Sequence, residues 1–144
     1  MAADSALADD ERRKSIIDAY FKRLDAGEEI MDLFAENAQV YFPKWGVATG
    51  TDEIGQLFSD LGSIVNALSH DYAYFNYVVD GDTVVVEGTS TGETSEGVEW
   101  RADDTPGGGR WCDVFEIRDG EIQRLFIYLD PDYAGEDTDR YPWL

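Results

Sequence analysis

Residues 111–130 read WCDVFEIRDGEIQRLFIYLD and predict a β-hairpin. Apolar side chains recur at alternate positions on both sides of Asp119-Gly120, a dipeptide typical of tight hairpin turns. Because successive side chains of a strand point to opposite faces, each arm can present one apolar face to a core. The chain therefore contains at least one antiparallel pair of strands, around which the other patterns can be placed.

The turn of this hairpin decides which side chains point inward. A two-residue turn would set Asp113 opposite Phe126, whereas a three-residue loop with a glycine bulge would set it opposite Leu125. We favour the three-residue loop, because Phe126, Tyr128 and Asp130 then point outward and an apolar layer forms inside. That inner layer holds Trp111, Asp113, Phe115, Ile117, Leu125, Ile127 and Leu129.

Three helices and several strands are predicted before the hairpin. Residues 9–25 carry apolar side chains on one helical face, and Gly27 suits the cap that ends such a helix. A short second helix is expected around residues 30–34, and a third follows Thr51 as its N-cap and continues to Val65. The predicted strands span residues 38–43, 72–79, 84–91 and 98–101.

The composition indicates one acidic domain. The chain has 144 residues, of which 31 are acidic and 11 basic, giving a formal net charge of −20. We assign residues 1–144 to a single domain with a tail at 131–144. Nucleic acid is not expected as a partner, nor is an anionic membrane surface, because both require clustered Lys and Arg.

Cysteine and histidine usage limits the chemistry further. Cys112 and His70 are each the only residue of their type, which excludes an internal disulfide and His- or Cys-rich metal sites. We expect no metal and no organic cofactor. The sequence contains no apolar run long enough for a membrane helix and no secretory signal, so a cytoplasmic location is expected.

These elements predict an α+β fold. Its strongly curved antiparallel sheet would be covered on the concave face by three N-terminal helices, with a cone-shaped pocket between the layers. The order of elements resembles the nuclear transport factor 2-like superfamily, in particular the SnoaL-like polyketide cyclases and the ketosteroid isomerases. The resemblance rests on IDAYF (17–21), LDAG (24–27), LFAENAQV (33–40), VDGDTVVVE (79–87), DVFEIRDGEI (113–122) and YLD (128–130). It also implies a homodimer formed through the outer face of the sheet.

Asp113 is the first candidate for a functional side chain. In the favoured register it points into an apolar layer, where desolvation disfavours the charged form of a carboxyl group. A neutral carboxyl can donate a hydrogen bond, and residues 113–115 resemble the stretch of ketosteroid isomerase that bears such an aspartate. The same resemblance implies that Tyr20 is the second donor. The alternative is that Asp113 pairs with an arginine such as Arg101 and that Tyr20 is ordinary core.

The proton-accepting carboxylate of those isomerases is missing. In VYFP (40–43), Phe42 stands where the resemblance places that carboxylate, and phenylalanine cannot accept a proton. His70 is a candidate replacement base, although a histidine at the start of a strand can also be a capping or surface residue. The side chains expected to line the pocket are Phe42, Trp45, Phe58, Trp111, Phe115, Leu125, Ile127 and Leu129, with Trp100 as a further candidate.

Two function classes follow. The first is the binding of a small, mostly apolar molecule through a carbonyl group, with Tyr20 and Asp113 as donors and His70 as a base. Such a protein would be an isomerase, cyclase or dehydratase that works without a cofactor. The second is a non-catalytic ligand-binding or dimerisation module of the same fold, which the loss of the carboxylate at Phe42 favours.

Overall fold

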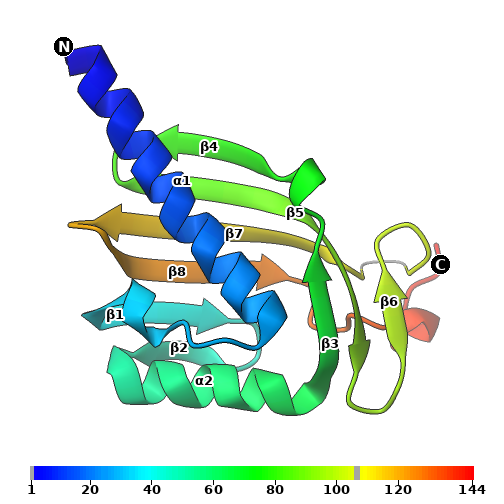
Figure 1. Ribbon diagram of the computed structural model, residues 1–144. Coiled ribbons are helices and arrows are strands. Elements are labelled where there is room, and N and C mark those ends of the chain that lie inside the picture. The colour runs from blue at the N-terminus through cyan, green and yellow to red at the C-terminus, as the bar shows by residue number, and fades with distance from the viewer. Residues whose placement is uncertain (1, 106–107) are drawn as a thin grey trace.

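The computed structural model describes residues 2–105 and 108–144, with side chains from Ser5 onward, and within them a curved, unclosed sheet is overlaid by helices (Figure 1). Helix α1 (Ala2–Ala26) crosses the sheet, and helix α2 (Gly50–Ile64) runs along one border. The strands are β1 (Phe34–Phe42), β2 (Gly46–Thr49), β3 (Val65–His70), β4 (Asn76–Asp80), β5 (Thr83–Thr94), β6 (Glu99–Arg101), β7 (Arg110–Arg118) and β8 (Glu121–Leu129). The predicted α+β class is confirmed.

The sheet is mixed, whereas the sequence patterns predicted an antiparallel one. Its strand order is β2-β1-β8-β7-β5-β3, and β1 pairs with β8 in parallel. These two strands are joined through most of the chain rather than by a hairpin, so no turn dictates their relative direction. Strand β5 changes partners along its length: its first part lies between β4 and β7, and its second part lies between β3 and β6. This exchange accompanies the curvature that opens a concave face.

The expectation of three helices is corrected to two α-helices in the part of the chain that the structure describes. The expected second helix is a single 3-10 turn, Met31–Leu33, because Phe34 already belongs to β1 and its ring is buried. Helix α2 begins after Thr49 rather than after Thr51, and Val65 starts β3. Helix α1 does end as expected, since Gly27 takes a φ of 70° and its N–H reaches the carbonyl of Leu24 at 3.2 Å.

Two strands have no counterpart in the sequence prediction, and one predicted strand is shorter. Strands β2 and β3 were not predicted, and the strand predicted at residues 72–79 begins only at Asn76. The preceding residues, Tyr72–Tyr74, form a 3-10 turn. As a result His70 lies at the end of β3, not at the entry of a strand.

The hairpin of β7 and β8 has the predicted inward face but not the predicted turn. Asp119 and Gly120 have φ values of 57° and 74°, so the turn has two residues rather than three. Glu116 pairs with Arg124 and Ile117 with Ile122, which leaves Gln123 as a bulge. The shorter turn and the bulge each move the register by one residue, so Asp113 faces Ile127 and not Leu125. The inner face is thereby buried as expected.

None of the helices in the described part of the chain is both long enough and apolar enough to cross a membrane.

Candidate active site

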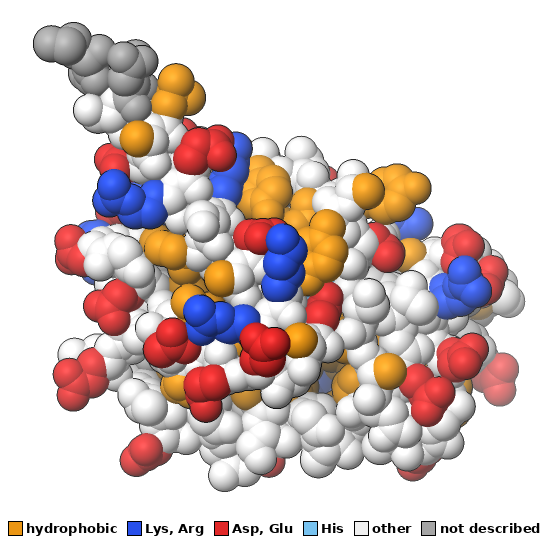
Figure 2. Space-filling model, viewed as in Figure 1, with side chains coloured by type: hydrophobic (Ala, Val, Ile, Leu, Met, Phe, Trp, Pro, Cys, Tyr) orange, Lys and Arg blue, Asp and Glu red, His pale blue; other side chains and the backbone are white. Residues whose placement is uncertain are grey.

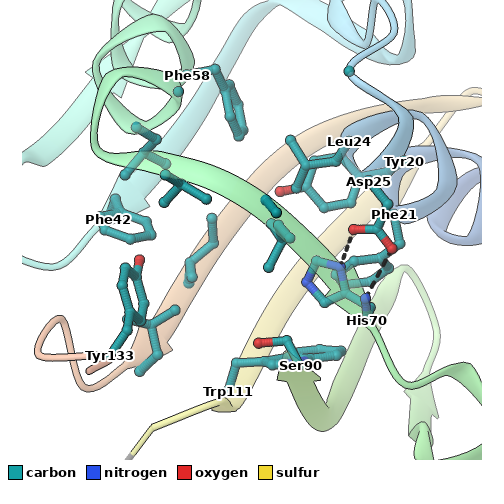
Figure 3. A pocket seen from close by; sticks show the side chains of 18 of the residues that line it. Tyr20, Phe21, Leu24, Asp25, Phe42, Phe58, His70, Ser90, Trp111 and Tyr133 are labelled. Atoms are coloured by element: carbon teal, nitrogen blue, oxygen red, sulfur yellow. Dashed lines mark hydrogen bonds and ion pairs between the residues drawn. The ribbon is translucent and has the colours of Figure 1, made fainter. Parts of the chain in front are cut away.

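A cavity of about 440 Å³ lies between the two helices and the concave side of the sheet. Its walls come from the end of α1, the second half of α2, β3, and the ends of β7 and β8. Most of the side chains expected to form a pocket do line it: Tyr20, Phe42, Phe58, His70, Trp100, Trp111, Asp113, Ile127 and Leu129. Figure 3 shows that aromatic rings form much of the wall. Such a wall, with few polar groups, is typical of a site for a small apolar ligand.

Three side chains expected in the pocket lie elsewhere. Trp45 donates its indole N–H to Oδ2 of Asp60 at 2.9 Å, which holds the ring against the surface of α2. Phe115 and Leu125 are fully buried in the core next to the pocket. Phe115 nevertheless supports the site, because its ring packs edge-on against Tyr20 with 5.7 Å between the ring centres.

Asp113 is a buried carboxyl group without a charge partner. It lies in the middle of β7, between Val86 of β5 and Ile127 of β8, and is only 3% exposed. Its Oδ1 accepts no hydrogen bond from any described residue. Burial raises the pKa of Asp113 well above its ordinary value. The alternative pairing with Arg101 does not occur, because that guanidinium lies beside Asp103 instead, with 3.7 Å between Nε and Oδ1.

Tyr20 reaches the same cavity from α1. Its side chain is 1% exposed, and its hydroxyl is directed into the pocket (Figure 3). Burial raises the pKa of Tyr20, and the nearby carboxyl of Asp113 raises it further. The phenol of Tyr20 is therefore neutral, and burial favours the protonated form of the Asp113 carboxyl. Two O–H donors in a largely apolar cavity can stabilise an oxygen on which negative charge develops.

His70 is hydrogen-bonded to Asp25, which was not among the predicted site residues. Nδ1 of the imidazole lies 2.6 Å from Oδ1 of Asp25, and the backbone N–H of His70 donates to Oδ2 at 2.9 Å. The hydroxyl of Tyr72 also donates to Oδ2, at 2.8 Å. Partial burial raises the pKa of Asp25, but the hydrogen bonds from His70 and Tyr72 outweigh it and lower the pKa overall. The carboxylate is thus ionised and can only accept.

This arrangement decides which nitrogen of His70 is available. Because an ionised carboxylate accepts the Nδ1 proton, the neutral imidazole keeps its lone pair on Nε2. Figure 3 shows that second ring nitrogen turned toward the pocket, away from Asp25. The rings of Phe21 and Trp111 pack against the imidazole, with centres 4.7 and 5.4 Å away. His70 can therefore accept a proton from a molecule bound in the cavity.

Four polar side chains of the pocket were missed by sequence reasoning: Asp25, Asn66, Ser90 and Tyr133. Asp25 had a usable signal, since it follows Phe21 by one helical turn and so shares the inward face of α1. Ser90 lies at the bend of β5 and accepts the indole N–H of Trp100 at 3.3 Å. Tyr133 follows β8 and stacks on Trp100. Neither Ser90 nor Tyr133 stands in a pattern that predicts an inward position.

The described residues that line the pocket lack the Lys and Arg side chains that the surface carries. Acidic side chains are scattered over the face seen in Figure 2, with Lys and Arg between them. Among the described residues that line the cavity there is no Lys or Arg. Nor do the residues at 2–105 and 108–144 bring together a group of three or more metal-binding side chains. A carboxylate or phosphate ligand would find no counter-charge here, so the site favours neutral molecules.

The fold and site define a class of α+β proteins in which a curved sheet and its helices enclose an apolar pocket. A family model described as the SnoaL-like domain matches residues 17–125, and the chain belongs to this family. The resemblance inferred from the sequence strings is thus confirmed. No curated protein matches the sequence.

Several solved structures have the same fold. A protein assigned as a polyketide cyclase from Sinorhizobium meliloti is 21% identical, with a TM-score of 0.62 over 79% of this chain and 94% of that one. A nuclear transport factor 2-like protein from Burkholderia xenovorans is 17% identical, with a TM-score of 0.67 over 88% and 95%. TerC, crystallised with polyporic acid, is 16% identical, with a TM-score of 0.68 over 83% and 92%.

Proposed function

We propose that the pocket binds a small, mostly apolar molecule through a carbonyl group and moves a proton on it. The observation that carries this proposal is the buried carboxyl of Asp113, whose Oδ1 has no partner among the described residues. A buried polar group without a hydrogen bond is costly, and a ligand oxygen placed at Asp113 would remove that cost. Tyr20 supplies the second donor.

The chemistry follows from the three groups taken together. His70 accepts a proton from the carbon next to the carbonyl through Nε2, and the electron pair of that C–H bond moves onto the carbonyl oxygen. The resulting enolate oxygen receives hydrogen bonds from Tyr20 and Asp113. General bases of this kind contribute about 10²–10⁴-fold to a rate, and each oxyanion donor about 10²–10³-fold.

The reaction class depends on what the enolate does next. If His70 returns the proton to a different carbon, the molecule is isomerised. If the enolate carbon attacks a second carbonyl of the same molecule, a C–C bond closes a ring and the second carbonyl oxygen takes up a proton. Loss of a hydroxide from the carbon beyond, with protonation to water, is a dehydration. Polyketide cyclase chemistry, assigned to a protein of the same fold, belongs to the second of these.

A second candidate function is non-catalytic binding of the same kind of molecule. Phe42 favours it, because this buried ring forms part of the pocket wall where the resemblance to ketosteroid isomerases places a carboxylate. In this case Tyr20 and Asp113 would hold a carbonyl ligand without changing it.

Deuterium exchange on 2-tetralone separates the two candidates. This bicyclic ketone has acidic hydrogens next to its carbonyl, and NMR in D₂O follows their replacement. We expect the protein to accelerate exchange over buffer, and His70→Gln and Tyr20→Phe to reduce the acceleration by about 10²-fold each. Binding of 2-tetralone without exchange would support the binding function. If 2-tetralone neither binds nor exchanges, both candidates are wrong.

We also propose a homodimer that uses the outer face of the sheet. On that face the ring of Tyr41 lies 5.6 Å from those of Phe126 and Tyr128, and Tyr128 is 47% exposed. The guanidinium of Arg124 lies 3.7 Å above Phe126. An exposed aromatic patch of this kind is suited to a second copy of the same surface. Analytical ultracentrifugation of Tyr128→Lys should show a shift toward monomer, and an unchanged sedimentation coefficient would contradict the proposal.

A further inference from the structure

The segment after β8 returns to the pocket and places a tyrosine in its wall. Tyr133 lies beyond the last strand, yet it lines the same cavity as Tyr20 and Asp113. In Figure 3 its hydroxyl is directed into the pocket, from the side opposite His70. The pocket thus has a polar group on each of two opposite sides, His70 and Tyr133.

The position of Tyr133 is held by a stack on Trp100. The two ring centres are 5.1 Å apart and the planes are inclined by 27°. Trp100 is itself 1% exposed, and its indole N–H donates to Oγ of Ser90. A Cβ at Gly92 would lie 2.3 Å from the indole carbons, so the ring rests directly on the backbone of β5. Tyr133 therefore stacks on a side chain whose position is set by its own contacts with β5.

The backbone around Tyr133 is also fixed. The carboxylate of Asp132 accepts the N–H groups of Glu136 and Asp137, both at 2.9 Å, which folds the segment into a tight turn. On the other side, a Cβ at Gly108 would lie 2.4 Å from the carbonyl oxygen of Tyr133. The segment is therefore in close contact with the loop that precedes β7.

Tyr133 is a hydrogen-bond donor under ordinary conditions. Burial raises the pKa of its phenol, and the nearby carboxyl of Asp113 adds to this effect. A neutral phenol that lines the cavity can donate a hydrogen bond to a ligand oxygen.

We propose that Tyr133 determines specificity by donating a hydrogen bond to a second oxygen of the ligand, at the end of the molecule remote from the carbon that His70 deprotonates. The ligand class is then a small, mostly apolar compound with oxygens at both ends, one a carbonyl. A cavity of about 440 Å³ is within the range that holds such a molecule. This inference rests on the proposed function, because the first oxygen is the one held by Tyr20 and Asp113.

The test compares two ketones of one skeleton. 2-Tetralone carries the carbonyl alone, and 6-hydroxy-2-tetralone adds a hydroxyl at the opposite end. Titration calorimetry should show that the protein binds the hydroxylated ketone about three- to tenfold more tightly, the range expected for one hydrogen bond. Tyr133→Phe keeps the stacking ring, and we expect it to abolish this preference while the Kd for 2-tetralone stays within about twofold.

Tyr74→Phe is the matched control, since Tyr74 is 75% exposed and lies outside the pocket wall. It should keep the preference. If Tyr133→Phe weakens the binding of both ketones equally, or leaves the preference for the hydroxylated ketone intact, Tyr133 is only part of the wall and the inference is wrong. If neither ketone binds the unmodified protein, the proposed function fails and this inference fails with it. The two failures are distinct, because the first still allows 2-tetralone to bind.

Discussion

Nδ1 of His70 and Oδ1 of Asp25 lie 2.6 Å apart. The two residues are 45 positions apart in the sequence, and the packing of β3 beside the end of α1 brings them together. The same carboxylate also accepts the backbone N–H of His70. Asp25 therefore fixes both the ring and the strand end that carries it. We propose that this pair takes the role of the carboxylate that is absent at Phe42, because Nε2 of His70 can accept a proton in the pocket.

Asp25 should act as a positioning residue for His70. In Asp25→Asn the amide can still occupy the site, but it no longer stabilises a protonated imidazole. We expect the rate of deuterium exchange on 2-tetralone to fall about 10- to 100-fold, with a smaller change in the Kd of the ketone. The pH dependence of the exchange rate should also shift, which a purely structural role would not produce.

Asp18→Asn is the control for this variant, because Asp18 lies on the same helix but pairs with Lys22 at the surface, at 2.8 Å. It should exchange 2-tetralone at the unmodified rate. Equal rates for Asp25→Asn and the unmodified protein would show that Asp25 does not orient the base.

Replacing Asp113 should stabilise the protein in a pH-dependent way. Burial raises the pKa of Asp113 in the folded state, so the folded protein binds a proton that the unfolded chain has lost. Folding stability therefore decreases by about 1.4 kcal/mol per pH unit between the unfolded and the folded pKa. Asp113→Asn removes this loss. Its melting temperature relative to the unmodified protein should rise as the pH increases above about 4, the ordinary pKa of aspartate. A difference that is constant with pH would be incompatible with this explanation.

Restoring a carboxylate at position 42 should add a second base. Phe42 is buried and lines the pocket, so Phe42→Asp places a carboxyl group close to a bound ketone. We expect turnover of a β,γ-unsaturated ketone to appear or increase, with some loss of stability from the missing ring. The absorbance of the conjugated product measures the rate. Phe42→Asn is the control, because asparagine has nearly the same volume as aspartate but cannot act as a base. An equal rate for the two variants would argue against a proton-transfer role for this position.

Gly92 should tolerate no side chain. A Cβ there would lie 2.3 Å from Trp100 and 2.4 Å from the carbonyl oxygen of Ala67, so either the indole or β3 must move. We expect Gly92→Ala to lower the free energy of unfolding by about 1–3 kcal/mol. Gly55 of α2 has no atom within 4 Å of its Cβ position, and Gly55→Ala should raise the free energy of unfolding by about 0.5–1 kcal/mol. Urea denaturation measures both, and equal effects would mean that Trp100 is not tightly held.

The sequence predicts which side chains of a single element face the core better than it predicts how distant elements pair. The alternation at 111–117 correctly placed Asp113 on the buried face, even though the bulge at Gln123 was not foreseen. The shorter turn and the bulge each shift the register by one residue. The total shift is two residues, so the same side chains still face inward. The parallel pairing of β1 with β8 has no local signal, because no turn joins these strands.

The polar residues of the pocket were not predicted for the same reason, because their positions depend on contacts between distant elements. Residues 65–70 read VNALSH, which continues the apolar pattern of the preceding helix and conceals a strand. His70 could therefore be named as a candidate base, but its contact with Asp25 depends on how β3 crosses the end of α1. Tyr133 lies in a polar segment, where its inward position depends on the stack with Trp100.

The protonation state of Asp113 tests the central claim most directly. With ¹³C-labelled aspartate, the carboxyl resonance of Asp113 can be assigned by its loss in Asp113→Asn and followed from about pH 3 to pH 8. The account predicts that this carboxyl stays protonated at neutral pH, because burial without a counter-charge raises its pKa. A resonance that titrates in the ordinary range of exposed aspartates, near pH 4, would show an ionised group in the pocket and would contradict the proposed carbonyl site.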